Sequence, residues 1–217
     1  MSIRHYLIPT TTQQQLEGAM FAIMCPMQTV FNGYGSVTYN GNTLGMIPAI
    51  STDPNVTHAA LVRSILQMPI GHYAVSWRGK TTRQVRSGSP ANPWETLWFV
   101  WDYIDPQHFT YLVVKPNGWE VGRRDTGPSS KGGQIFLKTE DATIDMIGRT
   151  ISVDVRRDLN EVEIVADFTD NAWPRLHLDV KLDIPFKYSD GITSDTCCTA
   201  VYTEDAAVQV TGWAIRS

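Results

Sequence analysis

The segment from Trp94 to Gly122, WETLWFVWDYIDPQHFTYLVVKPNGWEVG, concentrates much of the aromatic content of this chain. Its 29 residues include four tryptophans, two tyrosines and two phenylalanines. Aromatic and branched aliphatic runs in the segment are separated by the turn-forming letters DPQ and PNG. Runs of this kind between turn residues predict β-strands. The segment therefore predicts two central strands joined by a short turn.

Alternating patterns continue along the chain on both sides of this segment. TISVDVRRD places Ile151, Val153 and Val155 on one face, and RLHLDVKLDI alternates apolar and polar residues in the same way. A period of two is the pattern of half-buried antiparallel strands. Two such runs flank the letters RDLN, and two more flank Asn40-Gly41, so both places predict hairpin turns.

These short strands, with little sign of helix, predict an all-β fold in which two antiparallel sheets pack face to face. Residues 55–66, NVTHAALVRSIL, fit either a strand or a helical turn. No shift in composition marks a domain boundary, so we expect a single β-sandwich domain over residues 1–217. Residues 1–32 are the hardest part to interpret and would form an N-terminal extension.

The composition argues against several classes of partner. The net charge is −4, and no block of lysine and arginine is present, so we expect no nucleic-acid partner. No apolar run approaches the roughly 20 residues of a membrane span, so we expect no membrane insertion. The N-terminus, MSIRHYLIPTTTQQQ, lacks the apolar core of a signal peptide. We expect a soluble protein made in the cytoplasm, with action in a virus particle or after non-classical export left open.

The three cysteines are Cys25, Cys197 and Cys198. Adjacent cysteines rarely bond to each other because the geometry is strained. No CxxC spacing suggests a zinc site. We expect reduced, partly buried thiols, with a bond from Cys25 to one of the other two as the alternative.

The central segment, continued as WDYIDPQHFTYLVVKPNGWEVGRRD, resembles the central strand pair of concanavalin A-like, laminin G-like jelly rolls. Supporting stretches are SPANPWE, THAALV and VYTEDAAV, so the resemblance covers roughly residues 33–215. It implies a two-sheet jelly roll and a glycan or polysaccharide partner. The group includes lectins, carbohydrate-binding modules, glycoside hydrolases, polysaccharide lyases and parts of virus particles, so the fold does not fix the function.

Candidate glycan-binding residues are aromatic or charged. Exposed indole rings stack on the C–H faces of sugars, and Trp94 and Trp98 are the rings that we expect to face a groove. Arg83, Arg86 and Glu120 would hydrogen-bond to sugar hydroxyls or carboxylates.

Candidate catalytic residues are fewer. The stretch TTRQVRSG loosely resembles the arginine-rich strand of jelly-roll alginate lyases, which would give Arg83 and Arg86 a role in binding uronate carboxylates. Tyr111 and Lys115, with His108, could form a lyase-like base set. However, QIF at 134–136 lacks the histidine of those lyases, and the Glu-x-Asp-x-x-Glu spacing of sandwich hydrolases is absent.

The sequence thus favours non-catalytic carbohydrate binding. A polysaccharide lyase or glycoside hydrolase is one alternative, and a structural or attachment protein of a virus or phage particle, assembling as a homo-oligomer or within the particle, is another. No cofactor is indicated. Calcium at the rim of the jelly roll, held by Asp102 or Asp105, is the one metal left open.

Overall fold

The structure is a computed structural model that describes residues 26–126, 133–171, 173–182, 188 and 190–216. These residues form β-strands and no helix. The strands are β1 (Met27–Phe31), β2 (Ser36–Asn40), β3 (Thr43–Ile47), β4 (Ala59–Ser64), β5 (Met68–Pro69), β6 (His72–Gln84), β7 (Leu97–Asp105), β8 (His108–Lys115), β9 (Gly118–Arg124), β10 (Gln134–Asp141), β11 (Ile151–Asp158), β12 (Glu161–Phe168), β13 (Leu176–Lys181), β14 (Thr196–Glu204) and β15 (Ala206–Arg216).

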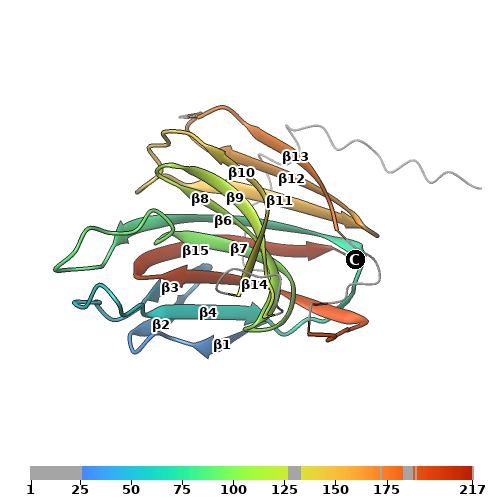
Figure 1. Ribbon diagram of the computed structural model, residues 1–217, viewed down its shortest axis with the longest axis horizontal. Helices are drawn as coiled ribbons and strands as arrows, with labels where there is room; N and C mark the ends of the chain where they lie inside the picture. Colours follow the sequence, from blue (N-terminus) through green and yellow to red (C-terminus); the bar gives the residue numbers. More distant parts are fainter. Residues whose placement is uncertain (1–25, 127–132, 172, 183–187, 189, 217) are drawn as a thin grey trace, which may run out of the picture.

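The strands form two antiparallel sheets that pack face to face (Figure 1). An eight-stranded sheet has the order β1-β4-β14-β7-β8-β9-β10, with β5 also paired to β14. A seven-stranded sheet has the order β13-β12-β11-β6-β15-β3-β2. The two-sheet antiparallel sandwich expected from the alternating sequence is therefore confirmed, and THAALV contributes to strand β4.

The main core lies between the sheets and contains much of the aromatic segment. Leu97, Phe99 and Trp101 of β7 point into it, and Trp77 of β6 contributes from the opposite sheet. Such rings contribute strongly to core stability because each buries a large apolar area. The alternation of β13 is also explained, because its leucine and valine side chains are buried and the residues between them are exposed.

The two expected hairpin turns are present, one of them shifted by one residue. β2 ends at Asn40, so Gly41 is the first loop residue, and its φ of +58° suits glycine at the first central position of a hairpin turn. The RDLN turn joins β11 to β12 as expected, with Leu159 at a φ of +52°.

Several other expectations can be placed on the structure. Within residues 1–32, the described strand β1 pairs with β4 as an edge of the eight-stranded sheet. Cys25 lies outside the described residues, whereas Cys197 and Cys198 are buried and free, as expected for reduced thiols. In the part of the chain that the structure describes, no helix is long and apolar enough to cross a membrane.

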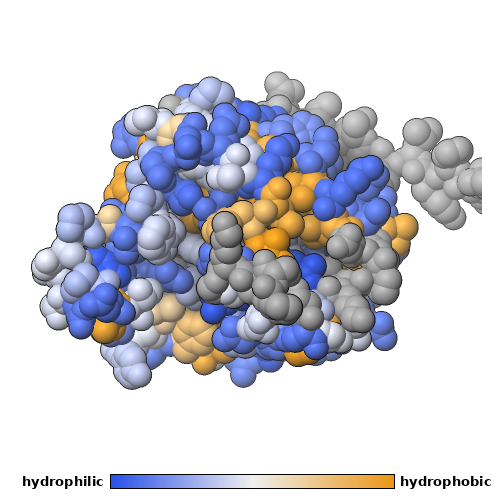
Figure 2. All heavy atoms as spheres, viewed as in Figure 1, coloured by the Kyte–Doolittle hydropathy of each residue, from blue (hydrophilic) through white to orange (hydrophobic). Residues whose placement is uncertain are grey.

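β10 forms the other edge of the eight-stranded sheet, and most of its side chains are exposed. Phe136 and Leu137 are its exposed apolar residues. Figure 2 shows apolar surface bordered by polar surface near the centre of the view, where β10 runs in Figure 1.

Candidate functional site

The outer face of the eight-stranded sheet carries a second aromatic cluster, separate from the main core. Because side chains alternate along a strand, Trp98 of β7 and Tyr111 of β8 point away from the residues that fill the core. The ring centroid of Trp98 lies 4.6 Å from that of Tyr111 and 5.2 Å from that of Tyr202 on β14.

Polar side chains are held among these rings. The hydroxyl of Tyr111 donates a hydrogen bond to Glu120 Oε1 at 3.2 Å, and Lys115 Nζ donates to Glu120 Oε2 at 2.5 Å. On β14, the hydroxyl of Tyr202 donates to Glu204 Oε1 at 2.5 Å. We call the group formed by Trp98, Tyr111, Lys115, Glu120, Tyr202 and Glu204 the outer cluster.

A glycine on β9 makes room for this arrangement. A Cβ atom at Gly122 would lie 2.3 Å from the hydroxyl oxygen of Tyr111. The phenol of Tyr111 therefore leans across β9 at Gly122, where there is no side chain in its way. This lets its hydroxyl reach Glu120, which lies two residues before Gly122 on the same strand.

The two carboxyl groups of the outer cluster have different surroundings. Glu120 forms an ion pair with Lys115. Burial raises the pKa of Glu204, although the hydrogen bond from Tyr202 and the charge of Arg124 act in the opposite direction.

Trp94 is the exposed ring next to the outer cluster. The indole Nε1 of Trp98 donates to the backbone oxygen of Trp94 at 2.8 Å. Trp94 is 42% exposed, whereas Trp98 is 2% exposed. Trp98 was expected to face a groove with an exposed ring. This is wrong, because the rings of Tyr111 and Tyr202 pack against it and bury it.

The strand register brings further polar groups to the same end of this face. Trp98 pairs with Val113, so Lys115 lies near the start of β7. Leu97 pairs with Thr203, so Glu204 lies there as well. Lys115 and Glu204 are both partly exposed.

The two arginines expected at the site lie elsewhere. Arg83 is an exposed residue of β6, in the seven-stranded sheet. The side chain of Arg86 is 2% exposed and donates to Glu95 Oε1 at 2.5 Å, Asp205 Oδ2 at 2.6 Å and the backbone oxygen of Asp53 at 3.1 Å. All three of its nitrogens are engaged, so the expectation that Arg86 contacts a sugar does not fit its surroundings.

Arg86 has a different role in the geometry of the site. Glu95 follows Trp94, and Asp205 follows Glu204. By bonding both carboxylates, Arg86 ties together the turns that carry the exposed ring and one acid of the outer cluster. The hydrogen bond to Glu95 raises the pKa of Arg86.

The two aspartates considered as calcium ligands do not fit that role. Asp102 is fully buried, accepts a hydrogen bond from Tyr73 at 2.6 Å and faces Arg157 at 3.4 Å. Asp105 instead bonds to His108. Calcium takes six to eight oxygen ligands, and the described residues contain no group of three or more His, Cys, Asp or Glu side chains arranged for a metal.

His108 lies between two carboxylates, an arrangement that the sequence did not indicate. Its Nδ1 lies 2.8 Å from Asp105 Oδ1, and its Nε2 lies 2.8 Å from Asp190 Oδ2. Both nitrogens therefore act as donors, which requires the protonated ring. Burial lowers the pKa of His108, but the bonds to the two aspartates outweigh this, so its pKa is raised overall. His108 is thus separate from Tyr111 and Lys115, and no base set of the three forms.

This arrangement predicts a pH dependence. Because the folded pKa of His108 is above the unfolded value of about 6.5, its bonds stabilise the fold fully below about pH 6.5 and are lost as the pH rises through the folded pKa. We expect the melting temperature of the wild type to lose this contribution as the pH rises above about 6.5, and His108→Gln to lack it. Thermal unfolding across this range tests the prediction. The control is His177→Gln, which changes an exposed histidine; equal slopes for the wild type and His108→Gln would contradict it.

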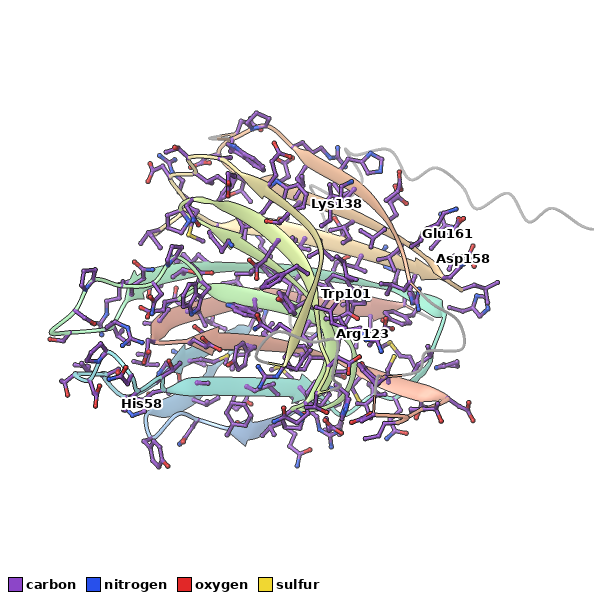
Figure 3. The ribbon with its side chains drawn as sticks, in the orientation of Figure 1. His58, Trp101, Arg123, Lys138, Asp158 and Glu161 are labelled. Atoms are coloured by element: carbon purple, nitrogen blue, oxygen red, sulfur yellow. The ribbon has the colours of Figure 1, made fainter. Side chains whose placement is uncertain are left out.

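A surface hollow of about 430 Å³ lies on the seven-stranded sheet, away from the outer cluster. Its lining is mainly charged, with Asp158 and Glu161 at the turn between β11 and β12 (Figure 3). It is lined by no aromatic side chain, so it lacks the stacking surface expected of a sugar site.

Comparisons with known proteins identify the fold. The chain is similar to a seed lectin of Lotus tetragonolobus, with a TM-score of 0.58, 10% identity, and coverage of 87% of this chain and 91% of that one. It is also similar to the exoplasmic domain of VIP36 (TM-score 0.51, 8% identity, 88% and 82% coverage). A third similar structure is a xylan β-1,4-xylosidase of Bacillus halodurans (TM-score 0.51, 9% identity, 82% and 33% coverage). No protein-family model and no curated protein matches the chain.

Proposed function

We propose that this chain, which has the concanavalin A-like fold of the lectins that it resembles, binds a carbohydrate at the outer cluster. The ligand would lie at the start of β7, against the exposed ring of Trp94. Lys115, Tyr202 and Glu204 are the partly exposed polar groups that would hydrogen-bond to sugar hydroxyls. Glu120 would hold Lys115 in place through the ion pair between them.

One observation carries this proposal. The outer face gathers rings and hydrogen-bonded carboxyl groups at one end, although this face is not the one that packs between the sheets. Sugar binding needs this combination, because the C–H faces of a sugar stack on rings while its hydroxyls need fixed donors and acceptors. The similar lectins support the proposal only through the shared fold.

The two unlike acids favour one further candidate, a glycoside hydrolase. Such enzymes need one protonated carboxyl to donate to the leaving oxygen and one ionised carboxylate to act as base or nucleophile. Glu204, whose pKa is raised by burial, fits the acid, and Glu120, which is ion-paired with Lys115, would be the second carboxyl group. A lyase is less well supported, because Arg83 and Arg86 lie away from Tyr111 and Lys115.

The binding test uses a panel of immobilised glycans, followed by calorimetry with the best binder. We expect Trp94→Ala to weaken binding by up to about tenfold, the value of one lost ring contact, and Lys115→Met to weaken it as well. Tyr39→Ala removes an equally exposed ring from the seven-stranded sheet and should leave binding unchanged.

Two outcomes would count against binding at this site. One is the absence of binding to any glycan of the panel, and the other is equal affinity for the wild type and Trp94→Ala. Release of reducing ends from a bound polysaccharide, lost in Glu204→Gln, would instead support the hydrolase.

A further inference from the structure

Arg157 is a fully buried arginine whose hydrogen bonds are not satisfied. It follows Val153 and Val155 on the inward-facing side of β11, so its side chain enters the core. Its exposure is close to zero, and none of its three nitrogens makes a hydrogen bond to another residue that the structure describes. Its Nε lies 3.4 Å from Asp102 Oδ2, an ion-pair distance outside hydrogen-bond geometry. A buried guanidinium without partners is costly, so this feature requires an explanation.

Other unsatisfied groups lie in the same layer of the core. Arg157 is the cross-strand neighbour of Tyr73, whose hydroxyl reaches across the gap between the sheets to Asp102 at 2.6 Å. On the far sheet, Trp101 precedes Asp102 and pairs with Thr110. The indole nitrogen of Trp101 and the hydroxyl of Thr110 are fully buried, and within the described part of the chain they make no hydrogen bond. Figure 3 labels Trp101 and Arg123, the residues that flank Thr110 on β7 and β9.

Most groups of this layer that lack a hydrogen-bond partner among the described residues are donors. Arg157 offers five N–H groups and Trp101 one, the Thr110 hydroxyl can donate as well as accept, and Asp102 Oδ2 is the acceptor left over. The nearby charges of Arg123 and Asp125 form their own ion pair at 3.1 Å. Burial raises the pKa of Asp102, although the charge of Arg157 and the hydrogen bond from Tyr73 act in the opposite direction. A guest that accepts hydrogen bonds and carries negative charge would match this layer.

We propose that Arg157, with Trp101 and Thr110, binds a small monovalent inorganic anion of the chloride type inside the sandwich. The guest is small because every group that would contact it is fully buried. It must accept hydrogen bonds because the unsatisfied groups of this layer are mainly donors. The proposal is independent of carbohydrate binding, because Arg157 lies between the sheets and the outer cluster lies on the far side of the eight-stranded sheet.

The direct test is a crystal of the wild-type protein grown in bromide in place of chloride. We expect an anomalous bromide peak in contact with the guanidinium of Arg157. Density for water there, or bromide peaks only elsewhere, would overturn the proposal.

A solution test compares full-length variants after dialysis into gluconate, a larger anion. Adding chloride at constant ionic strength should raise the melting temperature of the wild type in a saturable way. Arg157→Met should lose this dependence, whereas Arg156→Met, on the outward-facing side of the same strand, should keep it. The same response to chloride in wild type and Arg157→Met would overturn the proposal, and the bromide crystal decides the matter if Arg157→Met does not fold.

Discussion

Replacing Arg86 with methionine lowers the free energy of unfolding by about 3–5 kcal/mol, the usual cost of breaking a buried ion pair from one side. The side chains of Glu95 and Asp205 are both fully buried, and each receives a hydrogen bond from Arg86. Methionine would fill much of the space but would leave two carboxylates in the interior without their cation. Urea unfolding of the variant and the wild type measures the difference.

Arg83→Met is the matched control for this variant. It also removes one positive charge, three residues earlier in the chain and at an exposed position. The free energy of unfolding should therefore change by no more than about 0.5 kcal/mol. If the two variants unfolded at the same urea concentration, the cluster around Arg86 would be shown to contribute no net stability.

Local patterns predict most of the fold because strand alternation is a local property. Ile151, Val153 and Val155 face the core as their spacing indicates, and the RDLN turn joins the strands on either side of it. Alternation fails at Asp102. By parity it should share the face of Trp98, but its φ is +48° and the pairing of β7 with β8 is irregular between Trp101 and Asp105. This irregularity turns Asp102 into the core, where it meets Tyr73, and no local pattern predicts it.

The candidate site could be predicted only in part. Tyr111, Lys115 and Glu120 lie on two consecutive strands, so their grouping follows from one hairpin. Tyr202 and Glu204 reach the same face through the pairing of β14 with β7, which joins segments about a hundred residues apart. Their shared parity in the letters YTED is the one signal that could have placed them together, but that stretch resembles a turn.

Arg86 was misassigned for a similar reason. Its spacing from Arg83 is informative only if both lie on one regular strand, and β6 ends at Gln84. Beyond that point the chain forms a loop, and Arg86 turns inward towards two acids from distant turns. Long-range ion pairs of this kind depend on the complete topology, which the sequence alone does not supply.

Trp98→Ala should be the second strongly destabilising substitution, with a loss of about 3–5 kcal/mol, the usual range for truncating a buried tryptophan. The indole of Trp98 is packed between Tyr111 and Tyr202, and its N–H satisfies the backbone oxygen of Trp94. Alanine would leave a cavity under these rings and one acceptor without its donor. Thermal and urea unfolding measure the loss, and Trp98→Phe, which keeps a ring but removes the N–H, should lose less.

Trp94→Ala provides the contrast that separates stability from binding. Because the ring of Trp94 is 42% exposed, its removal should change the unfolding free energy far less than the removal of Trp98. The proposed site therefore predicts different effects of the two substitutions. Trp94→Ala should fold normally and bind the glycan weakly, whereas the main effect of Trp98→Ala should be a loss of stability. If Trp98→Ala unfolded like the wild type but no longer bound the glycan, Trp98 itself would contact the ligand. The ring of Trp98 would then not be packed between the two tyrosines in the protein that binds the glycan.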